Sequence, residues 1–169
     1  CSVMLFSCEN DIKTINSITD IKNFPSQSAK NIEILYSDSA IVKLKIIAPE
    51  MARFSNTSEP YIEFNSGIEA IFYDKDKQVE TRMTANYAIF YEAKEMWEAK
   101  EDVVVVSKKS GNINTELLIW DQKKEIFYSD KFVKITSDNE IIMGVGFEAD
   151  QNFNNYTILK PRGPINLPN

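Results

Sequence analysis

The stretch Glu95–Ser107 reads EMWEAKEDVVVVS, and Glu125–Ser137, EIFYSDKFVKITS, repeats its pattern without a gap. A period of about 30 residues is typical of a unit that cannot bury its apolar face alone and stacks on its neighbours. Apolar and polar residues alternate in both copies, so each unit is expected to be a pair of strands. The repeat therefore predicts an all-β protein of stacked strand pairs. Matching apolar positions are Trp97 and Phe127, Val103 and Val133, and Val105 and Ile135.

Composition narrows the possible functions. The chain has 169 residues, enough for one domain with a real core. Its formal net charge is −6 and it has no long basic run, so no nucleic-acid partner is expected. It contains no histidine, the commonest general base and metal ligand. Both cysteines, Cys1 and Cys8, lie outside the repeats. We therefore expect no metal, no cofactor and no enzymatic activity.

Alternating segments fill the chain from Asn31 onward. The strand expected at 42–48 should end at Pro49, because proline has no backbone N–H to donate to a neighbouring strand. Short polar or charged turns separate the segments, as antiparallel hairpins require. The expected strands are 32–36, 42–48, 61–64, 68–73, 79–85, 87–91, 96–99, 103–107, 113–120, 126–129, 132–136, 141–147 and 156–159.

The repeat also indicates which face of the strands is buried. Val104 aligns with Lys134. The set of alternate residues that contains these two positions therefore tolerates polar side chains and should face solvent. The opposite set stays apolar in both copies and should face inward. Such an inner face fits either a closed, packed sandwich or a sandwich open along one side that receives acyl chains. The residues expected to line it are Phe90, Trp97, Val103, Val105, Trp120, Phe127, Val133 and Ile135.

The first residues resemble a signal for export and membrane attachment. Leu5-Phe6-Ser7-Cys8 resembles a bacterial lipobox, in which Cys8 is lipidated and becomes the mature terminus. Two alternatives remain: Cys1 is the lipidated residue, or the segment is the end of a transmembrane anchor. Each predicts an exported protein tethered to a membrane. We expect residues 1–8 to be this remnant, 9–30 a spacer, 31–163 the β domain and 164–169 a tail.

Several stretches together resemble the LptC-type periplasmic protein of lipopolysaccharide export, in the form found in Bacteroidetes. The resemblance covers about four-fifths of the chain and depends on the order and spacing of the stretches, since none is a catalytic signature. The proteobacterial form of the family has a transmembrane helix, where we expect a lipobox or a truncated apolar segment in this chain. The stretches are NIEILYSDSA (31–40), KLKIIAPEM (43–51), TANYAIFYEAKEMWEAKEDVVVV (84–106), TELLIWDQKKEIFYSDKFVKIT (115–136) and GVGFEADQNFNNYTI (144–158).

The resemblance implies a twisted, open antiparallel β-jelly-roll that carries lipopolysaccharide. Such a protein accepts the lipid from an inner-membrane ABC transporter and passes it to an LptA-like periplasmic jelly roll. It would lie in the periplasm, tethered to the inner membrane. An open jelly roll also has two edge strands that can pair with partner sheets. We expect Ile32, Ile34 and Tyr36, or 42–48, to face the transporter, and Tyr156 and Ile158 to face the next carrier.

Three other functions remain open from the sequence. The chain could be a lipoprotein β-sandwich that binds a protein or a glycan, or a soluble LptA-like shuttle. It could also be a hydrolase with paired carboxylates, for which Asp121, Glu125 and Asp130 are the candidates. Because Asp121 recurs as Asp150 in a weaker third copy, a structural role in turns suits it better.

The lipobox generates the first testable prediction. Metabolic labelling with a fatty-acid analogue should mark the wild-type protein, and Cys8→Ser should abolish the label because the acylated thiol is lost. A label that persists in Cys8→Ser and disappears in Cys1→Ser would move the lipidation site to Cys1. A wild-type protein that takes up no label would leave the anchor as the remaining alternative.

Overall fold

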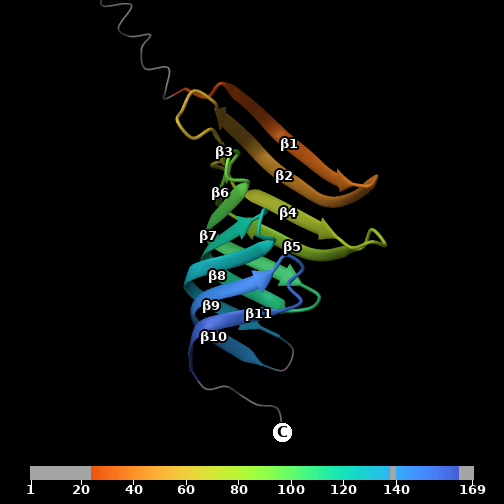
Figure 1. Cartoon of the computed structure of the whole chain (residues 1–169), viewed down its shortest axis with the longest axis vertical. Coiled ribbons are helices and arrows are strands. Elements are labelled where there is room, and N and C mark those ends of the chain that lie inside the picture. The colour runs from red at the N-terminus through yellow and green to blue at the C-terminus, as the bar shows by residue number, and fades with distance from the viewer. Residues whose placement is uncertain (1–23, 138–139, 164–169) are drawn as a thin grey trace, which may run out of the picture.

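The computed structural model describes residues 24–137 and 140–163, and within them the regular structure is entirely β (Figure 1). Cys1, Cys8, the expected spacer as far as residue 23, and the expected tail 164–169 lie outside the described residues. The described part contains no helix capable of crossing a membrane. The strands are β1 (Gln27–Asp38), β2 (Ile41–Phe54), β3 (Tyr61–Phe64), β4 (Ile68–Tyr73), β5 (Val79–Ala85), β6 (Tyr87–Tyr91), β7 (Met96–Ser107), β8 (Gly111–Asp121), β9 (Ile126–Thr136), β10 (Ile141–Asp150) and β11 (Tyr156–Arg162).

All the strands belong to one antiparallel sheet. β11, β10, β9, β8 and β7 follow one another, and β7 then pairs with both β5 and β6. These two branches rejoin at β2, through β4 on one side and through β3 on the other. β1 pairs with β2 at one end of the sheet, and β11 pairs with β10 at the other. Among the described strands, β1 and β11 are therefore the two edges.

The strands bend or break along a common line, which we call the crease. β3 and β4 are separated there by residues 65–67, and β5 and β6 by Asn86 alone. β7 crosses the crease through Glu101 and Asp102, which have positive φ angles of 64° and 54°. β10 crosses it at Gly146, with φ of 83°. Such bulges sharply bend a strand, and aligned bulges fold the whole sheet.

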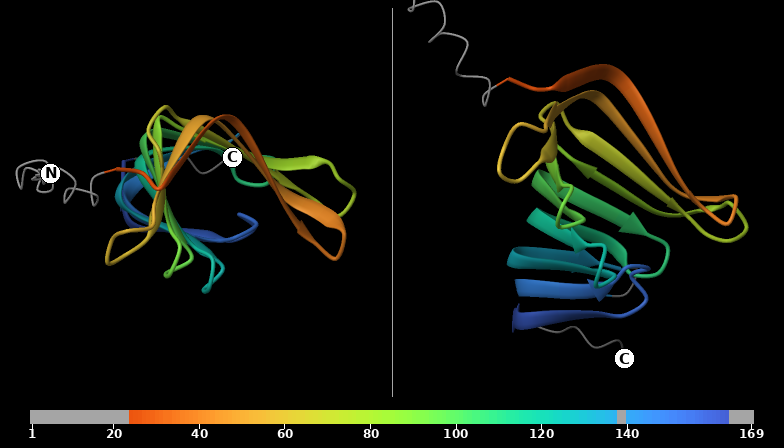
Figure 2. Two further views of the ribbon diagram at one scale, coloured as in Figure 1. Left: turned by 90° about the horizontal axis from the view of Figure 1, so that it is seen from above. Right: turned by 45° about the horizontal axis from the view of Figure 1, so that its top comes forward.

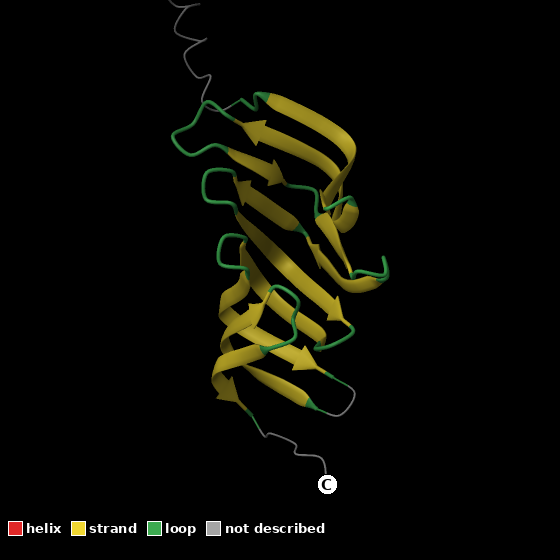
Figure 3. Ribbon diagram, turned by 45° about the vertical axis from the view of Figure 1, so that its right-hand side comes forward, coloured by secondary structure: helices red, strands yellow, loops and turns green. Residues whose placement is uncertain are grey.

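The crease makes two facing walls out of one sheet, an open β-jelly-roll. Seen along the stack, the strands form an arch that is open on one side (Figure 2, left), and the long strands contribute to both of its sides (Figure 3). The first wall contains β3, β6 and the strand parts 96–100, 117–121, 126–129 and 147–150. The second wall contains β4, β5 and the parts 103–107, 111–115, 132–136 and 141–145.

Side chains at the crease replace ladder hydrogen bonds that the bend removes. Thr115 Oγ1 donates to the carbonyl oxygen of Phe132 at 2.9 Å. The amide of Lys131 donates to Ser129 Oγ at 3.1 Å. Thr115 and Ser129 are both buried, and their hydroxyls lie 3.4 Å apart. The bend is thus hydrogen-bonded inside the molecule, as buried backbone requires.

The prediction that Pro49 ends its strand was wrong. β2 continues through Pro49 to Phe54, because proline falls where no partner needs its missing N–H. Before Pro49, β2 pairs with β4 over residues 44–47; after it, β2 pairs with β3 over residues 52–54. On the β1 side, Asn31 lies opposite the proline with φ of 51°. β1 also begins at Gln27, inside the segment expected to be a spacer.

The repeat corresponds to two successive strand pairs, β7–β8 and β9–β10. Four segments predicted as separate strands are halves of longer strands. Segments 96–99 and 103–107 are the two halves of β7, and 126–129 and 132–136 are the two halves of β9. The turns that precede β7 and β9 also match. Glu95 and Glu125 both adopt left-handed φ angles, of 52° and 58°. Each carbonyl accepts from the next layer: Gln122 N donates to Glu95 O at 3.1 Å, and Gln151 N to Glu125 O at 3.0 Å.

Gly144 allows β11 to lie close against β10, and this generates a prediction. A Cβ at this position would overlap the carbonyl oxygen of Lys160 and lie 2.5 Å from Ile158 Cγ2. Gly144→Ala should therefore lower the free energy of unfolding by about 1–3 kcal/mol. Amide hydrogen exchange should show the lost protection concentrated in β11.

The matched control is Val145→Ala, at the next residue of β10 and on the opposite face of the strand. It should leave the protection of β11 unchanged. Equal exchange in β11 for wild type and Gly144→Ala would contradict the close approach of these two strands.

Candidate functional site

An unbroken row of side chains crosses the inner face of the first wall. Each member is the cross-strand partner of the next, from β3 through β6, β7, β8, β9 and β10 to β11. Most are aromatic, and ring centroids lie 4.6 Å apart for Phe90 and Trp97 and 5.4 Å for Trp120 and Phe127. We call this the aromatic row; its members are Ile62, Phe90, Trp97, Trp120, Phe127, Ala149 and Tyr156.

A second row, almost entirely aliphatic, crosses the inner face of the second wall. It begins on the edge strand β1 and ends on β10, again with each member opposite the next. Together the two rows make the interior apolar from one edge of the sheet to the other. The members of this aliphatic row are Ile34, Ile46, Ala70, Met83, Val105, Ile113, Ile135 and Ile142.

The two walls pack against each other across the interior. Phe72 of β4 meets the aromatic row edge-on, with centroid distances of 5.7 Å to Trp120 and 6.1 Å to Phe127. Val105 and Val133 are 0% exposed. The middle of the interior is therefore filled by the protein's own side chains.

Between the lips of the arch lies a groove with a volume of about 590 Å³. Its floor includes Leu44, Phe72 and Trp120, so it reaches the aromatic row. This volume lies within the roughly 300–1,000 Å³ usual for small-molecule sites. The rim carries both signs of charge and does not select an anion by charge alone. Its charged residues are Asp38, Lys43, Asp74, Lys75, Glu80, Lys109 and Glu125.

Phe153 closes the interior near β11. Ala149 is the one small member of the aromatic row, and the ring of Phe153 stacks on the neighbouring Phe127 at 4.6 Å. Phe153 is 2% exposed and has a left-handed φ of 54°. The corresponding left-handed turn residues of the other layers, Glu95 and Glu125, are exposed. The β10–β11 turn thus directs an aromatic ring inward, whereas the β6–β7 and β8–β9 turns present a carboxylate to solvent.

Asp150 holds that turn. Its carboxylate accepts from the amides of Asn152, Asn154 and Asn155 at 2.9–3.1 Å and from Asn155 Nδ2 at 2.9 Å. Partial burial opposes ionisation, but these hydrogen bonds together keep the pKa of Asp150 below its usual value. The anion is therefore the form that stabilises the turn carrying Phe153.

Two donors in the aromatic row lack acceptors. Trp97 Nε1 and Trp120 Nε1 are buried without a hydrogen-bond partner, and the two residues are cross-strand neighbours. Among the described residues, the one other buried side-chain polar atom without a hydrogen-bond partner is Ser110 Oγ. An unsatisfied buried donor costs about 1–3 kcal/mol, so native proteins rarely contain one without a reason.

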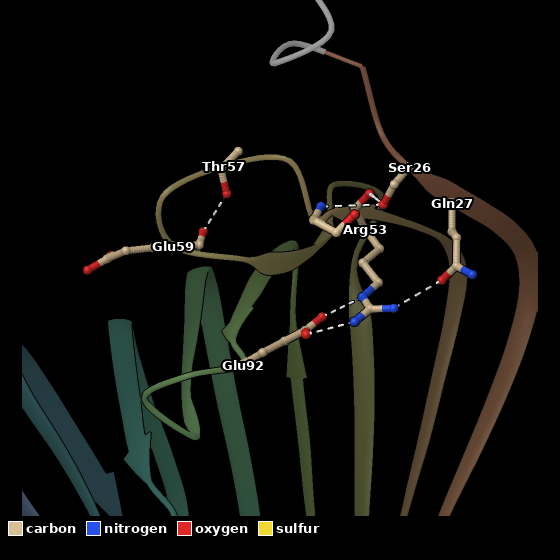
Figure 4. A network of polar contacts seen from close by, with 7 residues as sticks. Ser26, Gln27, Arg53, Thr57, Glu59 and Glu92 are labelled. Atoms are coloured by element: carbon tan, nitrogen blue, oxygen red, sulfur yellow. Dashed lines mark hydrogen bonds and ion pairs between the residues drawn. The ribbon is translucent and has the colours of Figure 1, made fainter.

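A polar network fastens the first wall near β1 (Figure 4). Arg53 donates to Glu92 through Nε at 2.6 Å and Nη2 at 2.9 Å, and Nη1 reaches Gln27 Oε1 at 3.4 Å. The guanidinium hydrogen bond holds the pKa of Glu92 below its usual value. Ser26 Oγ also donates to Arg53 O at 3.0 Å. The network ties the start of β1 and the β6–β7 turn to β2.

Six of the eight residues expected to line the interior belong to the two rows, and Val103 and Val133 lie beside the aliphatic row in the second wall. Val103, Val105, Phe127, Val133 and Ile135 are buried. Phe90, Trp97 and Trp120 are partly exposed, and of these three Trp120 lines the groove. Ile32, Ile34 and Tyr36 belong to edge β1, and Tyr156 and Ile158 to edge β11. The alternative edge 42–48 was wrong, because β1 covers that part of β2.

Sequence reasoning missed several members of the interior. Ile46, Met83 and Ile113 follow the same alternation and were identifiable from it. Phe72 required knowledge that β4 faces the aromatic row. Phe153 lies in a turn, where alternation gives no signal; its one clue is that an aromatic residue replaces the charged residues of the other turns.

The carboxylates considered for a hydrolase are not arranged as a pair. Asp121 lies at the turn end of β8, where its hydrogen bonds from Lys124 lower its pKa. Asp130 lies at the crease, at the other end of the first half of β9, and contacts Lys131 at 3.3 Å. Glu125 is an exposed turn residue. No cluster of three metal-ligating side chains occurs in residues 24–137 and 140–163.

Comparison with known proteins identifies the family of this chain. A search of curated proteins gives no match. The family model described as lipopolysaccharide-assembly, LptC-related, matches residues 3–161, which include every strand up to the last residues of β11. The chain belongs to the LptC-related family of lipopolysaccharide-assembly proteins.

Proposed function

We propose that this protein is a non-enzymatic carrier that holds the acyl chains of lipopolysaccharide along its inner face. It accepts the lipid from an inner-membrane ABC transporter and passes it to an LptA-like jelly roll. The observation that carries the proposal is the pair of apolar rows, which together cover the interior from the edge strand β1, where the aliphatic row begins, to the edge strand β11, where the aromatic row ends. Family membership supports the same role.

The energetics of an acyl chain explain why such a trough suffices. Each methylene exposed to water costs about 0.8 kcal/mol, so a lipid with several chains needs continuous apolar cover to cross an aqueous compartment. In the empty state the walls cover each other, which protects the apolar rows from water. Chains entering from the groove replace wall–wall contacts by wall–lipid contacts of the same chemical kind. The drive for transport then comes from the transporter's ATP hydrolysis.

The two edges suit a bridge of jelly rolls. β1 and β11 each have one side without a partner strand within the described residues. An edge of this kind extends a sheet when a partner strand is added. We place β1 toward the transporter and β11 toward the next carrier, in a periplasmic protein held to the inner membrane by its N-terminal segment. Pro161 and Lys160 in β11 limit uncontrolled pairing.

One observation favours a second candidate, a lipoprotein β-sandwich that binds a protein or a glycan. The middle of the interior is packed, and a module that binds on its outer surface requires no opening of the walls. Lipid capture from the inner face distinguishes the two functions.

Photocrosslinking tests the carrier directly. A photoreactive side chain at Trp120, Phe127, Val105 or Ile135 should capture lipopolysaccharide, because these residues lie on the inner face. The matched controls are Val104 and Lys134, the next residues of β7 and β9, which face outward. Equal capture from both faces would contradict the trough, and no capture from the inner face would favour the surface-binding module.

The β11 edge generates a second prediction. Asp150 N donates to Asn155 O, so alternation along the hairpin directs the Ile158 amide away from β10. Ile158→Pro should weaken docking to the next jelly roll at least tenfold, because it removes an outward donor. Pull-down or crosslinking of the purified partners measures the effect.

The control is Ile158→Ala, which removes the same side-chain packing but keeps the N–H. Both variants should lose similar thermal stability, and the alanine variant should still dock. Equal docking of the two variants would exclude the β11 edge as the bridge.

A further inference from the structure

Two buried hydrogen-bond donors occur at neighbouring positions in the middle of the aromatic row. Trp97 and Trp120 are directly opposite each other on β7 and β8, and both indole N–H groups are buried without an acceptor. Trp120 also lines the groove between the lips. Trp120 therefore lies where a chain entering the groove would meet the row, and Trp97 is the next member of the row.

The neighbours show that the row does not need these donors for packing. Phe90 and Phe127, the members on either side, fill their positions with rings that carry no polar atom. The tryptophan rings stack on them at 4.6 Å and 5.4 Å, as further phenylalanines would. Two indoles at adjacent positions thus add two N–H groups that the empty protein leaves unused.

The chemistry of an indole restricts the ligand. Its N–H donates and cannot accept, so the complementary group must be an acceptor oxygen. The strands that carry Trp97 and Trp120 are hydrogen-bonded neighbours, about 4.8 Å apart in a sheet. An acyl chain with two oxygens close together matches two donors at neighbouring positions, whereas a plain hydrocarbon satisfies neither.

We infer that Trp97 and Trp120 form a polar subsite in the trough that selects 3-hydroxyacyl chains. The indoles donate to the carbonyl oxygen and the 3-hydroxyl oxygen of one chain, while the rest of the chain lies along the apolar rows. This inference rests on the proposed function and adds to it the class of acyl chain that the carrier prefers. Satisfying two buried donors on loading also favours the occupied state over the empty one.

NMR spectroscopy of the full chain tests the subsite. The protein has two tryptophans, so its indole ¹H–¹⁵N spectrum contains two signals, which Trp97→Phe and Trp120→Phe assign. 3-Hydroxytetradecanoic acid should move both indole protons downfield and bind about tenfold more tightly than tetradecanoic acid, a difference of about 1.4 kcal/mol. Equal affinities with the same indole shifts for the two acids would overturn the inference.

An isosteric replacement provides the control. Benzothienylalanine keeps the bicyclic ring but has sulfur in place of the N–H, and feeding it in place of tryptophan changes both positions and no others. The preference for the hydroxylated acid should fall to near unity, while the affinity for tetradecanoic acid stays within about twofold. A preference that survives the replacement would also overturn the inference.

Crosslinking and NMR experiments with lipopolysaccharide distinguish a failure of this inference from a failure of the proposed function. Capture at Phe127 or Ile135 without any change in the indole signals would leave the carrier standing and reject the subsite. Absence of capture together with absence of binding of either acid would reject both.

Discussion

The crease is the constraint on which the rest of the structure depends. A flat sheet of these strands would leave one apolar face exposed to water from β1 to β11. Because the strands bend or break at the same line, one half of the sheet covers the other. The bend requires left-handed backbone at Glu101 and Asp102, a conformation that costs about 1–3 kcal/mol per residue. Burial of two continuous apolar rows offsets that cost.

The same arrangement reconciles a packed interior with a carrier. The walls join along the crease and separate toward the groove. Across the open side they therefore touch through side chains, mostly by apolar packing. Phe72 against Trp120 and Phe127 is such a contact. Apolar contacts of this kind are not directional, and an acyl chain can replace them with little change in chemistry. Along each wall, by contrast, the hydrogen-bonded ladder keeps the strands together. The proposed carrier function requires opening across the interior, while the ladders keep the strands together along each wall.

Much of this fold was predictable from the sequence, for physical reasons that also explain the failures. Alternation determines which side chains share a face of a strand. The repeat correctly predicted that the face with Val103, Val105, Val133 and Ile135 is buried. Strand ends and partners depend on the whole sheet. Pro49 was expected to end a strand, but it lies where β2 changes partners and no donor is needed. The position of Phe153 in the interior depends on a turn held by Asp150, which alternation does not describe. The unpaired indoles are visible only once the neighbours of Trp97 and Trp120 are known.

The central claim is that lipid enters between the two walls, and the distance across the open side tests it most directly. Lys75 on the β4–β5 turn and Lys123 on the β8–β9 turn are exposed, and they lie at the opposite lips of the groove lined by Lys75 and Glu125. Spin labels at Lys75→Cys and Lys123→Cys, in a chain carrying Cys1→Ser and Cys8→Ser, report this distance by double electron–electron resonance. We predict a longer and broader distance distribution with lipopolysaccharide than without it. An unchanged distribution at saturating lipopolysaccharide would contradict the central claim.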